Sequence, residues 1–405
     1  MKSLVVQKYG GTSVGDVQKI MHVADKIIEL RKNGKDVIVI LSAMSGETNR
    51  LVGLAHSITP TPNQREMDRL LCTGEMVTIA LLAICLENQG YPAISLTGRQ
   101  MGILTDSSYT KAKIKEINSD VIQKYLDAGK VVVAAGFQGI DETGNVTTLG
   151  RGGSDTSAVA IAAAMKASIC EIYTDVDGVY TADPRIIKEA RRIDRISYEE
   201  MLELASLGAK VLHSRSVEFG LKYNVPILVK STFKEGGGTL VTKEDSSMED
   251  IVVSGLSCLK EQAKVKFIDV KDKPGIAATI FSSIADKNIV VDMIIQNVGS
   301  DGLTDLSFTI DAADVDSIKP TLQEISTSID AEYSIDSNIS KVSVVGAGMR
   351  SHSGIASKMF KELGKSGINI QMISTSEIKI SIVVNKNDTD RAMQVLHDCF
   401  ELGKS

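Results

Sequence analysis

Residues 1–240 of the chain alternate short runs rich in β-branched side chains with longer helical patterns. In one of these patterns, Gln18–Lys32, Ile20, Val23 and Ile27 keep an apolar face. Such alternation is typical of a parallel or mostly parallel sheet covered by helices on both faces, and it predicts an α/β fold. The strands are expected at Leu4–Lys8, Asp36–Leu41, Ala93–Leu96, Val131–Ala135, Ile169–Thr174 and Val225–Val229.

The C-terminal part of the chain contains an internal repeat with an offset of 79 residues. At this offset Gly275-Ile276-Ala277 aligns with Gly354-Ile355-Ala356, and Met293-Ile294 aligns with Met372-Ile373. Each repeat shows a strand, a glycine turn that opens a helix, two strands and a second helix, which is a βαββα pattern. The polar stretch Lys243–Asp250 lies before the repeats and predicts an exposed linker, so the domain boundary is expected there.

The second repeat ends with the chain just after its second helix, without a closing strand. The first repeat continues into a candidate last strand at Ala331–Ile335. An apolar run at Ile251–Leu256 precedes the first repeat and has no partner in the pattern. Because an unpaired sheet edge is a liability, we expect this run to complete the second repeat.

Length and composition exclude several classes of protein. At 405 residues the chain is long enough for at least two domains. A formal charge of −6, no Trp and no Lys/Arg block make nucleic acid a poor candidate partner. The N-terminus lacks the apolar run of a signal peptide, and apolar stretches such as Ala158–Met165 are shorter than the roughly 20 residues that span a bilayer. We therefore expect a cytoplasmic protein with no membrane partner.

The cysteines and histidines carry no recognisable chemistry. Five cysteines are scattered without a CxxC pair, and the five histidines are dispersed as well. Buried free thiols are the favoured interpretation of the cysteines. No residue is assigned as a metal ligand.

A glycine-rich segment near the N-terminus, Lys8-Tyr9-Gly10-Gly11-Thr12-Ser13, follows one expected strand and precedes the first helix. Consecutive glycines expose backbone N–H groups, the helix adds its positive end, and Lys8 adds a full charge. This combination predicts a phosphate-binding loop. The alternative is a tight turn with a surface lysine; a Walker A motif is absent.

A second glycine-rich turn, Leu149–Thr156, opens a helix of small residues expected at Ser157–Met165. The planar guanidinium of Arg151 can bind a carboxylate through two parallel hydrogen bonds. Asp155, in the first turn of the helix, can orient a lysine or a metal. Two such loops on one sheet favour a site for a phosphate and a carboxylate, although two unrelated helix-start turns remain the alternative.

A third segment, Tyr173–Arg185, leaves a strand into a loop of acids, hydroxyls and one arginine. The position of Gly178 excludes an EF-hand, so a nucleotide-binding loop remains. The segment Gly346-Ala347-Gly348-Met349 has half of a dinucleotide-binding pattern, but Ser351 occupies the place of the third glycine. We interpret it as a strand end.

These motifs, together with Ser42–Asn49 and Cys72-Thr73-Gly74-Glu75, resemble those of the aspartate kinases of the amino-acid kinase superfamily along nearly the whole chain. The resemblance implies an amino-acid-kinase sandwich with a mostly parallel central sheet, followed by two ferredoxin-like βαββαβ ACT units. The implied domains are a kinase domain at 1–245, a linker and shared strand at 246–262, and ACT units at 263–340 and 341–405. No homoserine dehydrogenase domain follows, so the chain is similar to the monofunctional type.

The resemblance also implies roles for individual residues. Lys8 would neutralise the transferring phosphoryl group, and Asp155 would organise the charges around it. Substrate would be bound by Thr48, Glu75, Phe137, Arg151, Gly152, Gly153 and Ser154, with Glu75 on the ammonium and Arg151 on the α-carboxylate. ATP would be bound by Lys8, Gly10, Gly11, Ser42, Thr174, Asp175, Tyr180, Arg185 and Lys210. An effector would be bound by Asp272, Gly275, Ile276, Ala277, Gln296, Asn369 and Ile370.

The implied activity is phosphorylation of the side-chain carboxylate of L-aspartate by ATP with Mg²⁺, the first step of lysine, threonine and methionine biosynthesis. Lysine, threonine or both are the implied feedback inhibitors, and a homo-oligomer formed through the ACT units is expected. A separate regulatory subunit starting at Met248 is one option, although an ordinary internal methionine is favoured. Three alternatives stay open: a glutamate or acetylglutamate kinase, a catalytically silent amino-acid sensor, and repeats that serve only for dimerisation.

Overall fold

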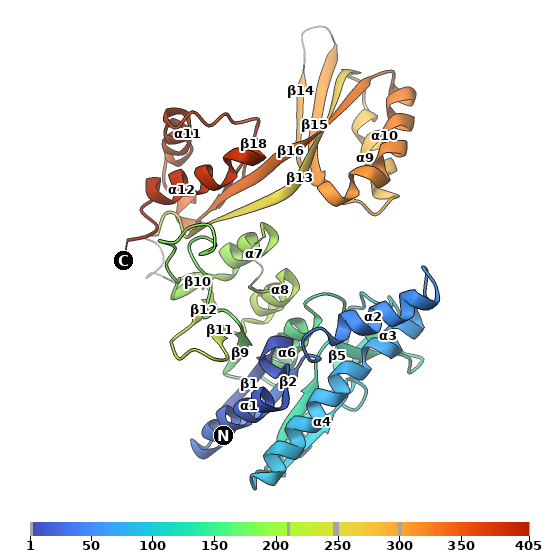
Figure 1. Cartoon of the computed structure of the whole chain (residues 1–405), viewed down its shortest axis with the longest axis vertical. Coiled ribbons are helices and arrows are strands. Elements are labelled where there is room, and N and C mark those ends of the chain that lie inside the picture. The colour runs from blue at the N-terminus through green and yellow to red at the C-terminus, as the bar shows by residue number, and fades with distance from the viewer. Residues whose placement is uncertain (1–2, 209–210, 246–250, 299–301, 405) are drawn as a thin grey trace. The chain divides into compact units, whose positions relative to one another are not determined.

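A computed structural model describes residues 3–208, 211–245, 251–298 and 302–404. The chain forms two compact units (Figure 1). The first unit contains Met1–Val179 and Arg192–Glu249, and the second contains Tyr180–Arg191 and Asp250–Ser405. The segment Tyr180–Arg191, called here the inserted segment, therefore belongs to the second unit although first-unit sequence flanks it on both sides. No pattern in the sequence predicts that this segment belongs to the second unit.

The first unit is built on an eight-stranded sheet with the order β10-β12-β11-β9-β1-β2-β6-β3. All neighbouring strands are parallel except β11 and β12. This confirms the mostly parallel α/β sheet. The strands are β1 Leu4–Tyr9, β2 Asp36–Leu41, β3 Ala93–Leu96, β6 Val131–Ala135, β9 Ile169–Thr174, β10 Arg195–Ser197, β11 Ile227–Ser231 and β12 Thr239–Thr242.

One predicted strand is displaced along the sequence. The run expected at Val225–Val229 forms β11 two residues later, and Pro226 lies just before it. Proline has no backbone N–H for a central ladder, so a strand begins after it more readily than through it. The carbonyl of Pro226 still accepts a hydrogen bond of 2.9 Å from Cys170 N.

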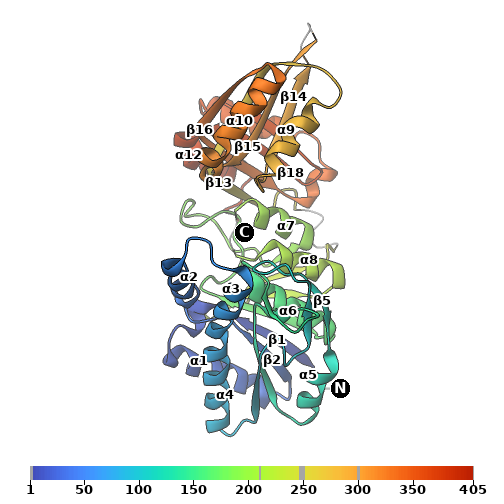
Figure 2. The same ribbon diagram turned by 90° about the vertical axis from the view of Figure 1, so that its right-hand side faces the viewer.

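Helices cover both faces of the large sheet (Figure 2). On one face α1 and α4 pack together over a core that includes Ile27, Val39, Leu82 and Val133. On the other face α6 contacts β1, β2 and β9, and α8 packs against α6. The helices of this unit are α1 Val17–Lys32, α2 Glu47–Ile58, α3 Gln64–Leu71, α4 Thr73–Asn88, α5 Ser119–Asp127, α6 Gly153–Ala164, α7 Tyr198–Ser206 and α8 Ser214–Tyr223, with a 3-10 turn at Gly11–Val14.

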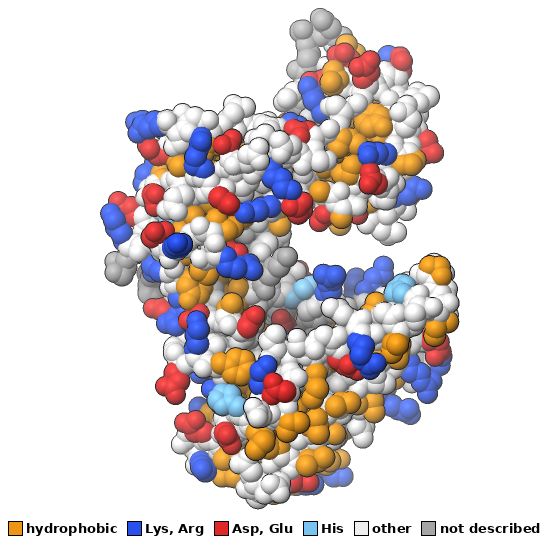
Figure 3. Space-filling model, viewed as in Figure 1, with side chains coloured by type: hydrophobic (Ala, Val, Ile, Leu, Met, Phe, Trp, Pro, Cys, Tyr) orange, Lys and Arg blue, Asp and Glu red, His pale blue; other side chains and the backbone are white. Residues whose placement is uncertain are grey.

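The consecutive helices α3 and α4 form a stretch, Gln64–Asn88, that is long and apolar enough to cross a membrane by length and composition. It is longer than the apolar run Ala158–Met165 considered from the sequence. Core helices of soluble proteins have the same properties, and α4 places Ile79, Leu82 and Leu86 in the core. Met76, Val77 and Ile84 of α4 are exposed. Figure 3 shows hydrophobic side chains gathered on this face of the first unit, over α4.

A second, smaller sheet of the first unit was not predicted. Its order is β5-β4-β7-β8, with β4 Ile103–Thr105, β5 Ile114–Ile117, β7 Gln138–Ile140 and β8 Val146–Thr148. Strands of three or four residues are too short to show an alternating pattern. The β7–β8 hairpin leads directly into the second glycine-rich turn.

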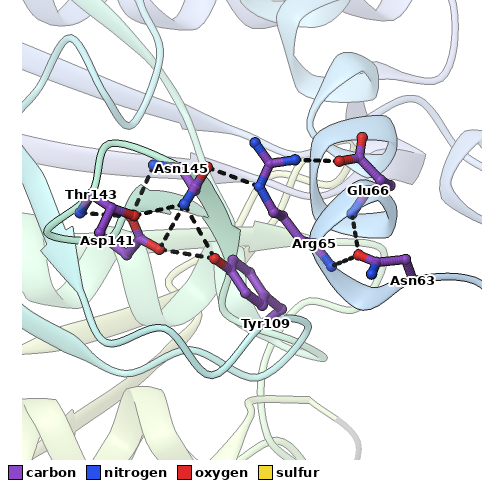
Figure 4. A network of polar contacts seen from close by, with 7 residues as sticks. All are labelled: Asn63, Arg65, Glu66, Tyr109, Asp141, Thr143 and Asn145. Atoms are coloured by element: carbon purple, nitrogen blue, oxygen red, sulfur yellow. Dashed lines mark hydrogen bonds and ion pairs between the residues drawn. The ribbon is translucent and has the colours of Figure 1, made fainter.

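A polar network ties the tip of this hairpin to the start of α3 (Figure 4). The buried carboxylate of Asp141 accepts hydrogen bonds from Thr143, Asn145 and Tyr109, and Arg65 donates to Asn145 at 2.9 Å. Burial alone would raise the pKa of Asp141, but these hydrogen bonds hold the pKa well below its ordinary value.

The second unit contains one six-stranded antiparallel sheet with the order β14-β15-β13-β16-β18-β17. Two strands, β13 Gly255–Lys271 and β16 Glu332–Val345, are long enough to serve both repeats. The remaining elements are β14 Asp292–Val298, β15 Leu303–Asp311, β17 Met372–Thr375, β18 Lys379–Asn385, α9 Ile276–Ala285, α10 Val315–Ile329, α11 Ile355–Lys365 and α12 Thr389–Cys399, with 3-10 turns at Ala312–Asp314, Ala347–Arg350 and Lys386–Asp388.

Each repeat has its own hydrophobic core. The first core contains Phe267 and Phe308, and the second contains Val344 and Leu396. The start of β13 pairs Gly255 with Val345 and Leu256 with Val344, so the last two residues of the expected run Ile251–Leu256 lie in the sheet of the second repeat. The first four residues of that run are not part of a strand. The segment Gly346–Met349, interpreted from the sequence as a strand end, directly follows β16, which ends at Val345, and most of it forms a 3-10 turn.

The domain boundaries inferred from the sequence remain predictions. Part of the expected linker, residues 246–250 with Met248, lies outside the described residues.

The inserted segment is integrated into the second unit. Thr181 carbonyl accepts a 2.7 Å hydrogen bond from Leu256 N, and Thr181 Oγ1 lies 3.2 Å from Nε2 of the buried His397. Ala182 and Ile187 are buried in the core of the second repeat. The second half of the predicted nucleotide loop therefore folds as a part of the second unit.

Candidate active site

A cavity of about 350 Å³ lies in the first unit, where strands of the large sheet end. The parallel register aligns the ends of β1, β2, β6 and β9, since Tyr9 pairs with Leu41 and Tyr173 and Leu41 pairs with Ala135. Ligands of open α/β sheets bind at this edge. The lining residues are Lys8, Gly11, Ser42, Ala43, Met44, Ser45, Gly46, Thr48, Glu75, Phe137, Gly150, Arg151, Gly152, Gly153, Ser154 and Asp155.

Lys8 and Asp155 form the charged centre of this cavity. Lys8 Nζ lies 2.7 Å from Asp155 Oδ1, and the two side chains are only 11% and 12% exposed. The contact is an ion pair without the alignment of a hydrogen bond, and Asp155 Oδ1 accepts no hydrogen bond from the described part of the chain. The two predicted catalytic residues, 147 positions apart in the sequence, are thus brought together.

The glycines of both loops permit close backbone approaches that a side chain would prevent. A Cβ on Gly11 would lie 2.8 Å from the carbonyl oxygen of Ala43. Gly152 has a φ of +67°, and a Cβ there would lie 2.2 Å from the ring of His213. Both positions therefore require glycine. The helix expected at Ser157–Met165 begins earlier, at Gly153, so Asp155 lies in its first turn as predicted.

Glu75, in the first turn of α4, is a buried carboxylate that faces the cavity. Oε1 accepts a hydrogen bond of 3.2 Å from Ala43 N, whereas Oε2 has no hydrogen-bond partner among the described residues. Burial raises the pKa of Glu75 to about 7. A buried carboxylate oxygen without a partner is costly, so a ligand that donates a charged hydrogen bond would relieve it.

The predicted ATP residues are only partly gathered at this edge. Gly11 and Ser42 line the cavity, and Gly10 N donates to Tyr173 O at 3.3 Å, which places Gly10 beside the end of β9. Thr174 ends β9, and its hydroxyl donates to Asp175 at 3.0 Å.

Two further predicted ATP residues do not line the cavity. Tyr180 and Arg185 lie on the inserted segment, in the second unit, where Arg185 forms a 2.7 Å ion pair with Asp183. Lys210 lies outside the described residues.

Five cavity residues had no assigned role from the sequence: Ala43, Met44, Ser45, Gly46 and Gly150. Four of them lie within the segment Ser42–Asn49, in which only Ser42 and Thr48 had been assigned a role. Its run of small residues after a strand was the available signal.

A separate cavity of about 450 Å³ lies in the first repeat of the second unit. Five of the seven predicted effector residues line it, namely Asp272, Gly275, Ile276, Ala277 and Gln296. The others, Asn369 and Ile370, do not. Additional lining residues are Lys271, Lys273, Pro274, Thr304 and Leu306. Gly275, with a φ of +95°, caps the N-terminus of α9, whose free N–H groups suit a carboxylate.

A metal ligand set is not evident within residues 3–208, 211–245, 251–298 and 302–404, where no group of three or more His, Cys, Asp or Glu side chains is arranged for an ion. Asp155 and Glu75 both line the cavity, and Asp155 is the carboxylate that lies beside Lys8. A single carboxylate is compatible with Mg²⁺ that arrives on nucleotide phosphates.

Models of known families match both parts of the chain. The amino acid kinase family matches residues 3–231, and ACT domains match residues 267–327 and 342–400. The expected combination of a kinase domain with two ACT units is confirmed.

Full-length relatives share this organisation. An aspartate kinase of Stutzerimonas stutzeri is 54% identical over 99% of this chain and 98% of its own, and the aspartokinase of Helicobacter pylori strain J99 is 50% identical over 98% and 99%. The structure of Escherichia coli aspartokinase III with aspartate and ADP covers 98% of this chain and 99% of its own at 26% identity and a TM-score of 0.80. With relatives this similar along its whole length, the chain belongs to the aspartate kinases of the amino acid kinase family.

Proposed function

We propose that this enzyme transfers the γ-phosphoryl group of ATP to the side-chain carboxylate of L-aspartate, forming 4-phospho-L-aspartate and ADP. The observation that carries the proposal is the joint placement of Lys8, Asp155, Glu75 and Arg151 around one small cavity. An amino acid with an additional carboxylate needs one anion for its ammonium and cations for its carboxylates, and this set supplies both. The reaction would be the first step of lysine, threonine and methionine biosynthesis.

In the proposed complex, the ammonium of aspartate binds Glu75 Oε2 and the α-carboxylate binds the guanidinium of Arg151. The backbone around Phe137 and Gly152–Ser154, with Thr48, completes the pocket. The β-carboxylate is already ionised near neutral pH, because its ordinary pKa is about 4, so no general base is needed. One of its oxygens attacks the γ-phosphorus, the bond to the bridging oxygen of ADP breaks, and Lys8 stabilises the charge in transit.

The nucleotide would bind along the glycine loop that follows β1 and the end of β9, through Gly10, Gly11, Ser42, Thr174 and Asp175. The exposed loop backbone and Lys8 suit its phosphates. Mg²⁺ would neutralise phosphate charge when bound, and Asp155 is the residue that would hold it. Tyr180, Arg185 and Lys210 are retained as proposed ATP contacts on the strength of the family resemblance.

The reaction can be tested by trapping the acyl phosphate. Purified enzyme is incubated with MgATP, hydroxylamine and either L-aspartate, L-glutamate or acetylglutamate, and the hydroxamate is measured. We expect product with aspartate alone. Product with glutamate or acetylglutamate instead would overturn the substrate assignment, and no product with any of them would favour an amino-acid sensor.

We propose lysine, threonine or both as inhibitors that bind the cavity of the first repeat. Lysine is bound with aspartate in a solved structure of Escherichia coli aspartokinase III, which is 26% identical to this chain with a TM-score of 0.76. In this chain, the N-terminus of α9 would bind the effector's carboxylate and Asp272 its ammonium. Inhibition requires that the effector bind one conformational state of the enzyme more tightly than the other.

Replacing Asp272 by alanine should raise the inhibitor concentration for half-inhibition about tenfold or more, the cost of one lost charged hydrogen bond. Activity without effector should stay unchanged. The measurement is inhibition by lysine and threonine, alone and together, with Asp286→Ala, an exposed aspartate outside the cavity, as the control. If both variants were inhibited equally, the effector would bind elsewhere. If neither lysine nor threonine inhibited the unmodified enzyme, dimerisation would remain as the role of the repeats.

Association through the repeats is proposed as well. The outer strands β14 and β17 carry Ile294 and Ile373 at equivalent repeat positions, and these side chains are 51% and 42% exposed. A native mass spectrum of the protein from its source would reveal a homo-oligomer and would also detect any second subunit that starts at Met248.

A further inference from the structure

Asp68, on α3, is a completely buried carboxylate that lies outside the cavity. Its two oxygens accept hydrogen bonds from Thr110 N at 3.0 Å, Thr148 N at 2.8 Å and Thr148 Oγ1 at 2.6 Å. Within the described residues no lysine or arginine forms an ion pair with it. A buried charge without a cation costs free energy, and hydrogen bonds offset that cost only in part. The carboxylate therefore calls for an explanation beyond stability.

The groups joined by Asp68 lie close in sequence to Glu75 and Arg151, the two charged residues predicted to bind substrate. On one side, α3 leads through Cys72 into the first turn of α4, which carries Glu75. On the other side, Thr148 ends β8, and Arg151 follows three residues later. Asp68 thus connects the backbone that carries the anionic group of the site to the backbone that carries its cationic group.

Two further contacts strengthen this connection at the same place. Gln138, opposite Thr148 in the β7–β8 ladder, is buried and donates to the carbonyl of Cys72 at 2.8 Å. From the other side of the turn, Arg215 on α8 donates to the carbonyls of Leu149 and Ala112 at 2.5 and 3.0 Å. Without Asp68, the Arg151 turn would therefore keep its fold but would lose the contacts that tie Thr110 and Thr148 to α3.

We propose that Asp68 is a positioning residue that sets the spacing between Glu75 and Arg151, and through it the affinity and stereospecificity for aspartate. The inference rests on the proposed function. L-aspartate and D-aspartate present the same three charged groups in different order around the α-carbon. Discrimination between them requires that the ammonium site, the α-carboxylate site and the phosphoryl centre be held in a fixed arrangement.

The test compares Asp68→Asn with Asp141→Asn. Asp141 is the matched control because it is also buried, at 2% exposed, and its network also ties the small sheet to α3, but at the far end from Glu75. Asp68→Asn should raise KM for L-aspartate about tenfold, since an amide N–H would face the backbone donors, and leave KM for ATP and kcat within about twofold. The preference for L- over D-aspartate, measured as kcat/KM, should fall at least about threefold.

Asp141→Asn should lower the unfolding temperature without changing either KM or the stereochemical preference. Thr148→Val, which removes only the hydroxyl contact, should raise KM for L-aspartate about threefold and serves if Asp68→Asn fails to fold. Unchanged KM for L-aspartate in the folded Asp68 and Thr148 variants, or equal losses in the Asp68 and Asp141 variants, would reduce Asp68 to a structural role. Absence of aspartate hydroxamate with the unmodified enzyme would instead overturn the proposed function itself.

Discussion

Replacement of Lys8 by alanine is expected to lower kcat about a hundredfold or more, as for a lost transition-state charge contact. Lys8 Nζ lies 2.7 Å from Asp155 Oδ1, and both side chains are nearly buried. Water therefore screens the charge of Lys8 only weakly, and its attraction for a phosphoryl group is strong. Removing it leaves Asp155 as an uncompensated anion where phosphate charge must enter. The measurement is kcat at saturating ATP and aspartate.

The matched control is Lys32→Ala, which removes an exposed lysine from the last turn of α1 and should leave kcat unchanged. Aspartate binding, followed by calorimetry, should survive in Lys8→Ala because Glu75 and Arg151 remain. A Lys8→Ala enzyme with near-normal kcat would refute the proposed mechanism.

Replacement of Glu75 by glutamine is expected to lower kcat/KM for aspartate about a hundredfold, since the ammonium would lose a buried anionic partner. The pH dependence should change too. Burial places the pKa of Glu75 at about 7, so in the unmodified enzyme kcat/KM should fall about tenfold per pH unit below that value as the carboxylate takes up a proton. In Glu75→Gln this limb of the profile should disappear.

The same substitution should stabilise the free protein in alkaline solution. Folding raises the pKa of Glu75 from an ordinary value of 4.5 to about 7, so the folded state binds the proton more tightly than the unfolded state. Stability is then highest below the unfolded pKa and declines as pH rises between the two values. At about 1.4 kcal/mol per pKa unit, ionisation of Glu75 lowers the free energy of unfolding by about 3 kcal/mol at pH 8. At pH 5 it lowers the free energy of unfolding by less than about 1 kcal/mol. Glu75→Gln should therefore raise the unfolding temperature more at pH 8 than at pH 5.

Glu87→Gln is the control for both measurements, because Glu87 lies on the same helix with an exposed side chain. It should change neither the pH profile nor the unfolding temperature. If Glu75→Gln retained the acidic limb of the profile, the ammonium site would have to be assigned to another residue. Destabilisation of the variant at pH 8 would instead contradict the raised pKa of Glu75.

Elements with strong periodicity could be predicted from the sequence. The strands that became β2, β3, β6 and β9 were expected at the ends observed, and α1 differs from its prediction by one residue. The small sheet of β4, β5, β7 and β8 could not be predicted from the sequence, because segments of three or four residues are too short to show a hydrophobic period. That sheet nevertheless positions the Arg151 turn, so a part of the fold without a sequence signal holds a central part of the site.

The candidate site was predictable where a loop motif carried its own chemistry. Lys8, Arg151 and Asp155 stand out as charged residues at glycine-rich turns or at a helix start, whereas Glu75 was assigned through the family resemblance. The structure places all four around one cavity. Ala43, Met44 and Gly150 were missed because they contribute backbone and shape rather than a reactive group. The location of Tyr180 and Arg185 in the second unit was hidden as well, since the inserted segment has the polar composition of an ordinary loop.

The order of motifs along the chain was enough to establish the α/β class, the two C-terminal repeats and the chemical types of the site residues, because periodicity and glycine turns are local properties. Only the tertiary structure decided which of those residues meet. Parallel strands that end at one edge, and burial from water, produce the Lys8–Asp155 pair and the bridge through Asp68. They also produce the oxygen of Glu75 that has no hydrogen-bond partner among the described residues. Distance and desolvation arise from packing between distant segments, and no local pattern encodes them.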